Sequence, residues 1–478
     1  GPADVPADRP ADRAAEAAAA AAATLDPAAA RAYHAAVRAL AERGRFGVRL
    51  GLTRTRALLK ALGDPQLRVR GALVGGTNGK GSVLALAGSA LRAAGVRVGS
   101  TPKPHLVSYR ERMEIDGRPI DPVTFAALVG DVLEVADHVE RRHGPPTEFE
   151  LLTAMLFRWF AEEGIDVALV EVGLGGRLDA THAWDGGVAA ITNVALDHMA
   201  WLGSTIEAIA KEKAAIIERG DVAVTAATGD ALRVIRRRAL RVGAPLRVVE
   251  EPRILAVDRD GIEVELARLG PTRISLRGRH QAQNAAVADA VLDALEEAGI
   301  AVVADDARRV GYASARWPGR LELLRVRGRD VLLDGAHNPA GAAALATALD
   351  DLRPHLEPGA VTLVLGSMGD KDVDGILRAL ARTEALGGTQ TVAGAHVIAT
   401  QVAGERALPA PDLARAWRAV APDTPVTVVA DVGQALDRAL RAAAGPVIVA
   451  GSLYLVGEAR RRWVDDPLVR DPDDVAVA

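Results

Sequence analysis

Residues 75–82 read Gly-Gly-Thr-Asn-Gly-Lys-Gly-Ser and lie between an apolar run at 72–74 and an Ala/Leu-rich stretch that ends at Ala94. A strand, a glycine loop and a helix in this order bind phosphate, because glycines let backbone N–H groups approach an anion and the helix N-terminus adds partial positive charge. Lys80 would meet the outer phosphates, and the Ser82 hydroxyl could ligate the accompanying Mg²⁺. The pattern predicts an ATP site.

The spacing of this loop departs from the common phosphate-loop pattern. Only three residues separate Gly75 from Gly79, and Gly81 stands between the lysine and the serine. A glycine-rich turn that binds nothing is the alternative. The lysine and serine stand in register after a buried strand, which favours nucleotide binding.

Polar residues also follow two other apolar segments. Glu171 ends the run at 167–170, and Asp197-His198 follows a strand expected at 188–194. A carboxylate at the C-terminal end of a buried strand needs a charged partner, and Mg²⁺ prefers oxygen ligands, so a metal site is predicted there. The alternatives are an acid that caps a turn and an ordinary polar histidine.

Two further clusters occupy comparable positions. Lys211 and Lys213 lie on the next predicted helix, where ion pairing on a solvated face would contribute little stability. Asp334 and His337 follow a strand in the second half of the chain, and either side chain could face the nucleotide. Asn338, before a proline, is suited to cap the following helix at the same time.

Composition limits the classes of protein to consider. The chain has 478 residues, 49% hydrophobic character, a net charge of −4 and a pI near 6.3. This length suits two or three domains, and the charge disfavours nucleic acid and anionic lipid as partners. The absence of cysteine excludes disulfides and thiolate metal sites. No signal peptide is evident, and no segment reaches the roughly 18 apolar residues of a membrane span, so we expect a soluble, cytoplasmic protein. We also expect a monomer.

The chain divides into an α/β domain, a linker and a second α/β domain. The linker is predicted at 316–320, where a proline and a glycine together end the preceding helix. Residues 1–24 hold few bulky apolar side chains, so we expect a disordered Ala/Pro-rich tail. Residues 25–317 alternate buried β-branched runs with amphipathic helices, which predicts a parallel-sheet ATPase domain, with a small antiparallel insertion at about 246–277 where the period becomes two. A smaller Rossmann-like domain is expected over 321–478, and a ligand would bind between the two domains.

The boundaries of individual elements follow from periodicity, caps and breakers. Helices are expected at 27–44, 53–62, 82–94, 122–142, 148–163, 205–218, 229–241, 281–298, 340–352, 373–381, 411–419 and 432–443, and strands at 167–172, 188–194, 222–225, 331–333, 361–365, 396–399, 426–429 and 447–450.

Nine short blocks carry a resemblance that covers about residues 44–460. They are Gly-Thr-Asn-Gly-Lys-Gly-Ser at 76–82, Pro-His-Leu at 104–106 with Glu-Arg at 111–112, Glu-Val-Gly-Leu-Gly-Gly-Arg-Leu-Asp-Ala-Thr at 171–181, Asp-His at 197–198, Glu-Lys-Ala at 212–214, His-Gln at 280–281 with Asn-Ala at 284–285, Trp-Pro-Gly-Arg at 317–320, Asp-Gly-Ala-His-Asn-Pro at 334–339 and Gly-Ser-Leu-Tyr-Leu-Val-Gly at 451–457. In this order they resemble the folylpolyglutamate synthase and dihydrofolate synthase family of the Mur ligase superfamily. The shortened phosphate loop resembles that of the same superfamily.

The resemblance implies an ATP-dependent ligase that adds L-glutamate to the carboxylate of a folate or a dihydropteroate. In that family the carboxylate attacks the γ-phosphoryl group to give an acyl phosphate, and the glutamate amine displaces phosphate to leave an amide. ATP and Mg²⁺ are the implied cofactors. Positioning and charge neutralisation would supply most of the catalysis.

The resemblance also implies roles for individual residues. The implied nucleotide contacts are Thr77, Asn78, Gly79, Lys80, Gly81, Ser82, Asn284, Arg320 and Asp334; the implied Mg²⁺ ligands are Ser82, Glu171 and His198; the implied pterin contacts are Phe149, Leu178, Asp179 and Ala180. Lys80 and His337 are implied catalytic residues. Lys213 matches a lysine that the family carries as a carbamate, which supplies an anionic oxygen near metal.

Lys103 is a departure from the family pattern. The family has Ser-Pro-His-Leu where this chain has Lys-Pro-His-Leu at 103–106, and that serine contacts metal or phosphate in relatives. A lysine cation cannot ligate Mg²⁺, so we hypothesise that Lys103 places its ammonium near the γ-phosphate or the acyl phosphate. The alternative is a lysine that faces solvent from a rearranged loop.

Other functions are compatible with parts of the sequence. A ligase of the same type could join another amino acid to another acid, although the blocks at 171–181 and 317–320 argue for folate. A nucleotide-dependent switch would need the phosphate loop and no amino-acid pocket. Formation of AMP and pyrophosphate would indicate an adenylating enzyme. Whether dihydropteroate, a reduced folate or both are accepted depends on pocket details that spacing does not resolve.

Overall fold

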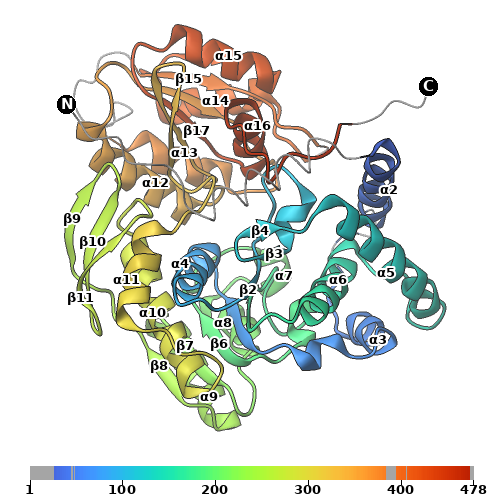
Figure 1. The fold of residues 1–478 in the computed structure, drawn as a ribbon. Helices are drawn as coiled ribbons and strands as arrows, with labels where there is room; N and C mark the ends of the chain where they lie inside the picture. The colour runs from blue at the N-terminus through green and yellow to red at the C-terminus, as the bar shows by residue number, and fades with distance from the viewer. Residues whose placement is uncertain (1–25, 45–46, 48, 384–394, 405, 474–478) are drawn as a thin grey trace, which may run out of the picture.

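The computed structural model describes residues 26–44, 47, 49–383, 395–404 and 406–473. The tail predicted at 1–24 lies outside the described residues. Two lobes make up the molecule, and Figure 1 shows the later one, coloured orange to red, stacked on the earlier one, coloured blue to yellow. We propose that the boundary between two domains falls in the predicted linker at 316–320.

A large, mostly parallel sheet forms the centre of the first lobe. Its order is β4-β3-β2-β5-β1-β6-β7-β8. The six strands β2, β5, β1, β6, β7 and β8 pair in parallel. The remaining two, β3 and β4, add antiparallel pairs at one edge. The strands are β1 (Gly71–Gly75), β2 (Val98–Thr101), β3 (Glu114–Ile115), β4 (Arg118–Pro119), β5 (Val167–Glu171), β6 (Gly187–Ile191), β7 (Val222–Thr225) and β8 (Leu246–Val248).

Helices cover both faces of this sheet. One face packs against α4 (Lys80–Ala93), α10 (Gln281–Glu297) and α11 (Asp305–Ser314). The other packs against α5 (Pro122–His143), α6 (Glu148–Glu163), α8 (Ile206–Ala214) and α9 (Gly229–Val242), with α2 (Pro27–Gly44) and α3 (Thr53–Ala61) outside them. The short α7 (Met199–Leu202) precedes α8.

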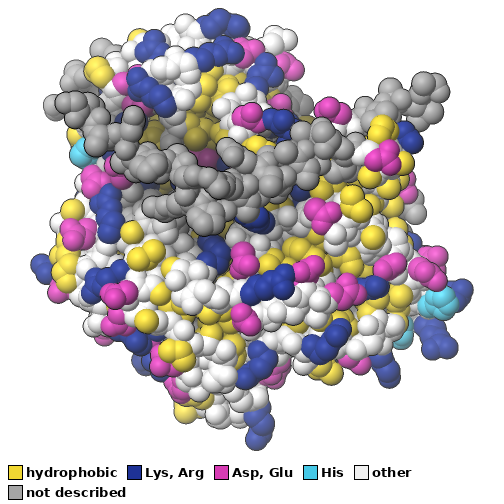
Figure 2. All heavy atoms as spheres, viewed as in Figure 1, with side chains coloured by type: hydrophobic (Ala, Val, Ile, Leu, Met, Phe, Trp, Pro, Cys, Tyr) yellow, Lys and Arg dark blue, Asp and Glu magenta, His cyan; other side chains and the backbone are white. Residues whose placement is uncertain are grey.

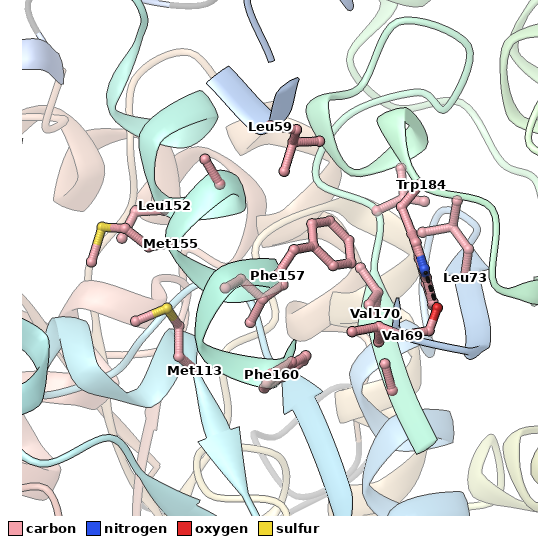
Figure 3. Packing of buried hydrophobic residues seen from close by; sticks show 14 of the residues in the cluster. Leu59, Val69, Leu73, Met113, Leu152, Met155, Phe157, Phe160, Val170 and Trp184 are labelled. Atoms are coloured by element: carbon pink, nitrogen blue, oxygen red, sulfur yellow. Dashed lines mark hydrogen bonds between the residues drawn. The ribbon is translucent and has the colours of Figure 1, made fainter. Parts of the chain in front are cut away.

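Burial on both faces explains the near-continuous apolar strands. Successive side chains of a strand point to opposite faces, so Leu73 and Val170 join one core while Val74 and Leu169 join the other. In the first of these cores, Phe157 of α6 packs against Trp184, whose indole N–H donates to the Val69 carbonyl at 2.9 Å (Figure 3). The rigid sheet fixes the ends of its central strands, where the chemistry is predicted.

A small antiparallel sheet follows the large one, as expected from the period-two pattern. Its order is β11-β10-β9, with β9 (Ile254–Asp258), β10 (Gly261–Leu266) and β11 (Gly270–Ile274). The insertion begins later than residue 246, because β8 pairs in parallel with β7 and extends the main sheet.

The second lobe holds a six-stranded sheet in the order β12-β13-β17-β14-β15-β16, parallel except for β12. Its strands are β12 (Glu322–Val326), β13 (Arg329–Leu333), β14 (Thr362–Leu365), β15 (His396–Ala399), β16 (Val426–Val428) and β17 (Val447–Ala450). Its helices are α12 (Pro339–Leu352), α13 (Val373–Ala381), α14 (Ala410–Val420), α15 (Val432–Ala442) and α16 (Leu453–Trp463).

The predicted fold class, two α/β units each with a largely parallel sheet, is confirmed. The sequence prediction missed β2, the β3–β4 edge, α11, β12 and α16, and it extended α8 to residue 218 where the helix ends at Ala214. Within the described residues, no helix combines the length and the apolar character needed to cross a bilayer. On the face shown in Figure 2, basic and acidic side chains are interspersed over the atoms that are not grey.

Candidate active site

One cavity of about 1040 Å³ contains all of the predicted site residues in its lining. It lies between the carboxyl ends of the central strands of the first lobe and the loop before α12 in the second. The predicted residues in its wall are Thr77, Asn78, Gly79, Lys80, Gly81, Ser82, Lys103, Phe149, Glu171, Leu178, Asp179, Ala180, His198, Lys213, Asn284, Arg320, Asp334 and His337. Segments up to 260 residues apart therefore share one site.

The glycines of the phosphate loop are required by close neighbours. Gly79 has a φ of 85° and ends the loop where α4 begins, and a Cβ there would overlap the Asn284 side chain. A Cβ at Gly81 would overlap the indole of Trp317. The glycine between the lysine and the serine therefore admits the linker tryptophan against the first turn of α4.

Lys80 folds back over its own loop. Its Nζ donates to the carbonyls of Gly76 and Thr77, both at 3.2 Å, and lies 3.8 Å from Glu171 Oε1. The parallel register sets Val74 beside Glu171, which places this carboxylate at the edge of the phosphate loop. The ammonium thus lies over the anion-binding concavity of the loop.

Glu171 is a buried carboxylate with one oxygen available to a ligand. Its side chain is 6% exposed, and Oε2 accepts the backbone N–H of Lys103 at 3.1 Å. Burial raises the pKa of Glu171, while Lys80 and Lys103 oppose that shift. Oε1 has Lys80 as its nearest charged partner, beyond hydrogen-bond distance.

Lys213 is buried, which rules out the solvated-face alternative for this lysine. It is 5% exposed, and its Nζ donates to the Gly76 carbonyl at 2.8 Å. Burial, followed by the nearby charge of Lys80, lowers the pKa of Lys213 to about 7. Lys211, two residues earlier on α8, is exposed. Lys213 therefore holds much neutral amine near neutral pH.

His198 lies at the mouth of the cavity. It has a φ of 49°, its side chain is 43% exposed, and Nε2 lies 3.8 Å from Asp197 Oδ1. Burial of the ring lowers the pKa of His198, so a neutral imidazole is available. Across the described ranges, no three His, Asp or Glu side chains gather closely enough to hold a metal.

The donor set at this edge nevertheless fits Mg²⁺. This ion usually binds one or two carboxylates together with water and substrate phosphates, so it does not need an all-protein cage. The Glu171 carboxylate and the buried Ser82 hydroxyl are oxygen donors in the same cavity wall. The assignment of Ser82, Glu171 and His198 as ligands stays a prediction.

The linker between the lobes places an arginine with a buried N–H donor in the cavity wall. Arg320 Nη1 is buried and has no hydrogen-bond partner among the described residues. An unpaired buried guanidinium N–H is costly unless an anion binds there. The nearby Asp334 carboxylate accepts N–H groups of Leu321 and Ala336, both at 2.9 Å. His337 Nδ1 donates to the Gly335 carbonyl at 2.8 Å.

The state of His337 follows from its burial. Desolvation lowers the pKa of His337 to about 4, so the ring is neutral at physiological pH. Because Nδ1 carries the proton that bonds to a carbonyl, Nε2 is left as an acceptor. His337 can thus orient a donor group or accept a proton, and it supplies no positive charge.

Apolar side chains form another part of the cavity wall. Phe149, at the start of α6, lies with Leu178 and Ala180 in the lining. The Asp179 carboxylate is buried, and it accepts the Leu174 N–H at 2.8 Å and the Thr181 N–H at 3.1 Å. Asp179 therefore shapes the glycine-rich loop, and its contact with a pterin stays a prediction.

Comparison with known proteins identifies the family. The Mur ligase middle domain matches residues 74–292, and the Mur ligase glutamate ligase domain matches residues 319–453. The dihydrofolate synthase/folylpolyglutamate synthase of Bacillus subtilis (strain 168) is 38% identical over 348 residues, which are 70% of this chain and 80% of that protein. The chain belongs to the folylpolyglutamate synthase/dihydrofolate synthase family.

Solved structures of folylpolyglutamate synthases share the fold. The Mycobacterium tuberculosis enzyme, complexed with ADP, is 33% identical with a TM-score of 0.81, covering 94% of this chain and all of that one. The bifunctional folylpolyglutamate synthase/dihydrofolate synthase of Yersinia pestis, complexed with AMPPNP and Mn ion, is 30% identical with a TM-score of 0.75. The match covers 90% of this chain and 97% of that one.

Lys103 does not face solvent, so that alternative is wrong. It is partly buried, its Nζ donates to the Glu171 carbonyl at 2.6 Å, and it lies 4.5 Å from the centroid of the Phe149 ring. Burial lowers the pKa of Lys103 to about 8, with Asp179 and Glu171 opposing the shift, so the side chain is mainly protonated at pH 7. In this folylpolyglutamate synthase family member, the Lys103 ammonium lies between the Glu171 carbonyl and the Phe149 ring.

Sequence reasoning found only half of the role of Asn338. Its predicted cap is confirmed, because its Oδ1 accepts the Gly341 N–H at 2.7 Å. Its Nδ2 also donates to Asn78 Oδ1 at 3.2 Å and to Asp197 Oδ2 at 3.3 Å, which joins the two lobes across the cavity. Sequence carries no local signal for such a contact. Trp317 and Arg112, which belong to the blocks at 317–320 and 111–112, also line the cavity of this family member, although the sequence analysis gave them no role.

Proposed function

We propose that this protein is an ATP-dependent ligase that joins L-glutamate to the carboxylate of a folate or a dihydropteroate and releases ADP and phosphate. The carrying observation is a single cavity whose lining holds a phosphate loop and basic groups together with apolar and aromatic side chains. Family membership supports the same reaction. We further propose a monomer in the cytoplasm.

The first step transfers a phosphoryl group to the acid. A carboxylate oxygen of the acid attacks the γ-phosphorus, the bond to the β-phosphate oxygen breaks, and ADP leaves with that electron pair. The N–H groups of the loop, Lys80 and the unpaired Arg320 donor would neutralise charge on the phosphate oxygens. Mg²⁺, held by Ser82, Glu171 and His198, would add electrostatic stabilisation of the phosphates when bound.

The second step forms the amide. The glutamate amine attacks the acyl carbon, the bond from that carbon to the phosphate oxygen breaks, phosphate leaves, and the nitrogen loses a proton. Neutral His337 faces this cavity from the second lobe and could take the proton at Nε2. The cavity lies between two lobes, so their closure would shield the acyl phosphate from water.

The test is an ADP-release assay with Mg²⁺, run with dihydropteroate and with tetrahydrofolate, each with and without L-glutamate. We expect ADP release in proportion to amide formed and only when acid and glutamate are both present. If ADP were released only with another acid and another amino acid, folate would not be the substrate. Formation of AMP and pyrophosphate would exclude an acyl phosphate, and tight ATP binding without turnover would indicate a switch.

Lys103 gives a separate prediction. Changing Lys103 to Ala should lower kcat/KM for the acid about tenfold, because a partly buried cation close to the Phe149 wall is removed. Lys103→Arg should retain part of the activity. Lys103→Ser should show modest loss and an altered dependence on Mg²⁺ concentration. A Lys103→Ala enzyme with unchanged constants for acid, ATP and Mg²⁺ would rule out a catalytic role for this side chain.

A further inference from the structure

The segment from Lys103 to Arg112, the 103–112 loop, presents one side to the cavity. Lys103, Pro104 and Arg112 contribute to the cavity lining. Arg112 Nε donates to His105 Nδ1 at 2.8 Å, which ties the two ends of the loop together. The position of this loop therefore sets where the Lys103 and Arg112 cations lie in the wall of the proposed acid site.

The other side of the loop is held by the second lobe. Arg461 of α16 donates to the Val107 carbonyl at 3.2 Å. A Cβ at Gly457 would overlap the Leu106 carbonyl, which shows how closely α16 lies on the loop. The loop belongs to the first lobe by sequence, yet its outer surface is packed against the second.

The chain after α16 returns to the first lobe and contacts the same loop. Asp471 Oδ1 accepts Ser108 Oγ at 2.6 Å, the Tyr33 hydroxyl at 2.7 Å and Arg110 Nε at 3.4 Å. Arg110 Nη2 also donates to the Arg470 carbonyl at 2.8 Å. Figure 1 shows this red segment running from α16 towards α2, which carries Tyr33.

The partners of Asp471 make this contact hard to replace. Tyr33 is 0%, Ser108 1% and Arg110 3% exposed, so water reaches none of them freely. Without the carboxylate, two hydroxyls and part of a guanidinium would be left with fewer acceptors in a buried site, and a buried unpaired charge is strongly unfavourable. The contact therefore has more weight than a surface ion pair.

We infer that residues 465–472 form a strap in which Asp471 is a positioning residue: through Ser108 and Arg110 it sets the 103–112 loop and, with it, the acid-binding side of the cavity. The inference rests on the proposed function for its kinetic consequence. The strap leaves the second lobe directly after α16, so the acid site is complete only when that lobe is seated on the first.

The test compares Asp471→Asn with Asp473→Asn, an exposed position two residues further on. The asparagine keeps size but loses charge and acceptor strength. We expect Asp471→Asn to raise KM for the acid about tenfold, the effect of one lost charge-assisted hydrogen bond, with kcat and KM for ATP within about twofold. Asp473→Asn should match the unmodified protein.

Hydrogen exchange provides a readout that needs no activity. The amides of Leu106, Val107 and Ser108 donate to the Glu111 carboxylate, and they should exchange faster in Asp471→Asn while the amides of β1 stay unchanged. Tyr33→Phe removes one donor to Asp471 and should give a smaller change in the same direction, so it serves if Asp471→Asn does not fold.

A double variant examines the route of the effect. If the strap acts through the loop, Asp471→Asn and Lys103→Ala should be non-additive in kcat/KM for the acid. Equal losses for ATP and acid, or constants and exchange rates equal to those of Asp473→Asn, would overturn the inference. An unmodified protein that releases no ADP would refute the proposed function instead, and hydrogen exchange would still decide on the strap.

Discussion

Replacing Lys80 with Met is expected to lower glutamate-dependent ADP release about 10³-fold, the scale reached when a group that stabilises a transferring phosphoryl is removed. The Lys80 ammonium lies over the phosphate loop, 3.2 Å from two of its carbonyl oxygens. Methionine preserves the length and apolar stem of the side chain, so α4 should form normally. Coupled detection of ADP at saturating acid and glutamate measures the loss.

The same substitution should weaken the response to Mg²⁺. Lys80 is the first of the charges that hold down the pKa of buried Glu171, so without it that pKa rises further and the carboxylate is less often ionised. The Mg²⁺ concentration for half-maximal rate should therefore increase. Lys60→Met, at an exposed position on α3, is the matched control. Normal turnover of a Lys80→Met enzyme would show that the phosphate loop takes no part in the reaction.

Sequence was sufficient for the parts of the site that single segments determine. A buried strand followed by a glycine loop and a helix has one arrangement in a parallel sheet, so Lys80 and Ser82 were placed correctly at the carboxyl edge of β1. Glu171 was placed beside them because it ends an equally apolar strand, and the observed register sets it next to Val74. Local patterns and sheet topology together fix these positions.

Contacts between distant segments were not predictable in the same way. The strand β2 reads Val-Gly-Ser-Thr, and a polar strand with a glycine gives little periodic signal although the sheet buries all of it. Asn338 and Asp471 each make an ordinary local pattern, and their partners lie 260 and 438 residues away. Burial of Lys213 likewise depends on the packing of α8 under the phosphate loop. The charged residues next to Lys213 in the sequence instead suggested a solvated helix face.

Changing Lys213 to Ala should lower turnover about 10²-fold to 10³-fold, the cost of removing one preorganised electrostatic group, while the fold is retained. The proposed reason is a carbamate: a neutral amine adds to CO₂, forms an N–C bond and releases one proton, which converts a lysine into an anionic oxygen donor. Burial and the charge of Lys80 lower the pKa of Lys213 to about 7, so the reactive neutral amine is well populated between pH 7 and pH 8.

Rescue by small acids separates a carbamate from a lysine that acts as a cation. In Lys213→Ala, millimolar formate or acetate can occupy the vacated space with a carboxylate, and turnover should recover in part; methylammonium should give no recovery. Lys211→Ala, on the exposed side of the same helix, should behave as the unmodified enzyme. Rescue by the amine and not by the acids would assign a positive charge to Lys213. The carbamate requires the opposite, because a small carboxylate supplies the same anionic oxygens and the nearby Lys80 ammonium can balance their charge.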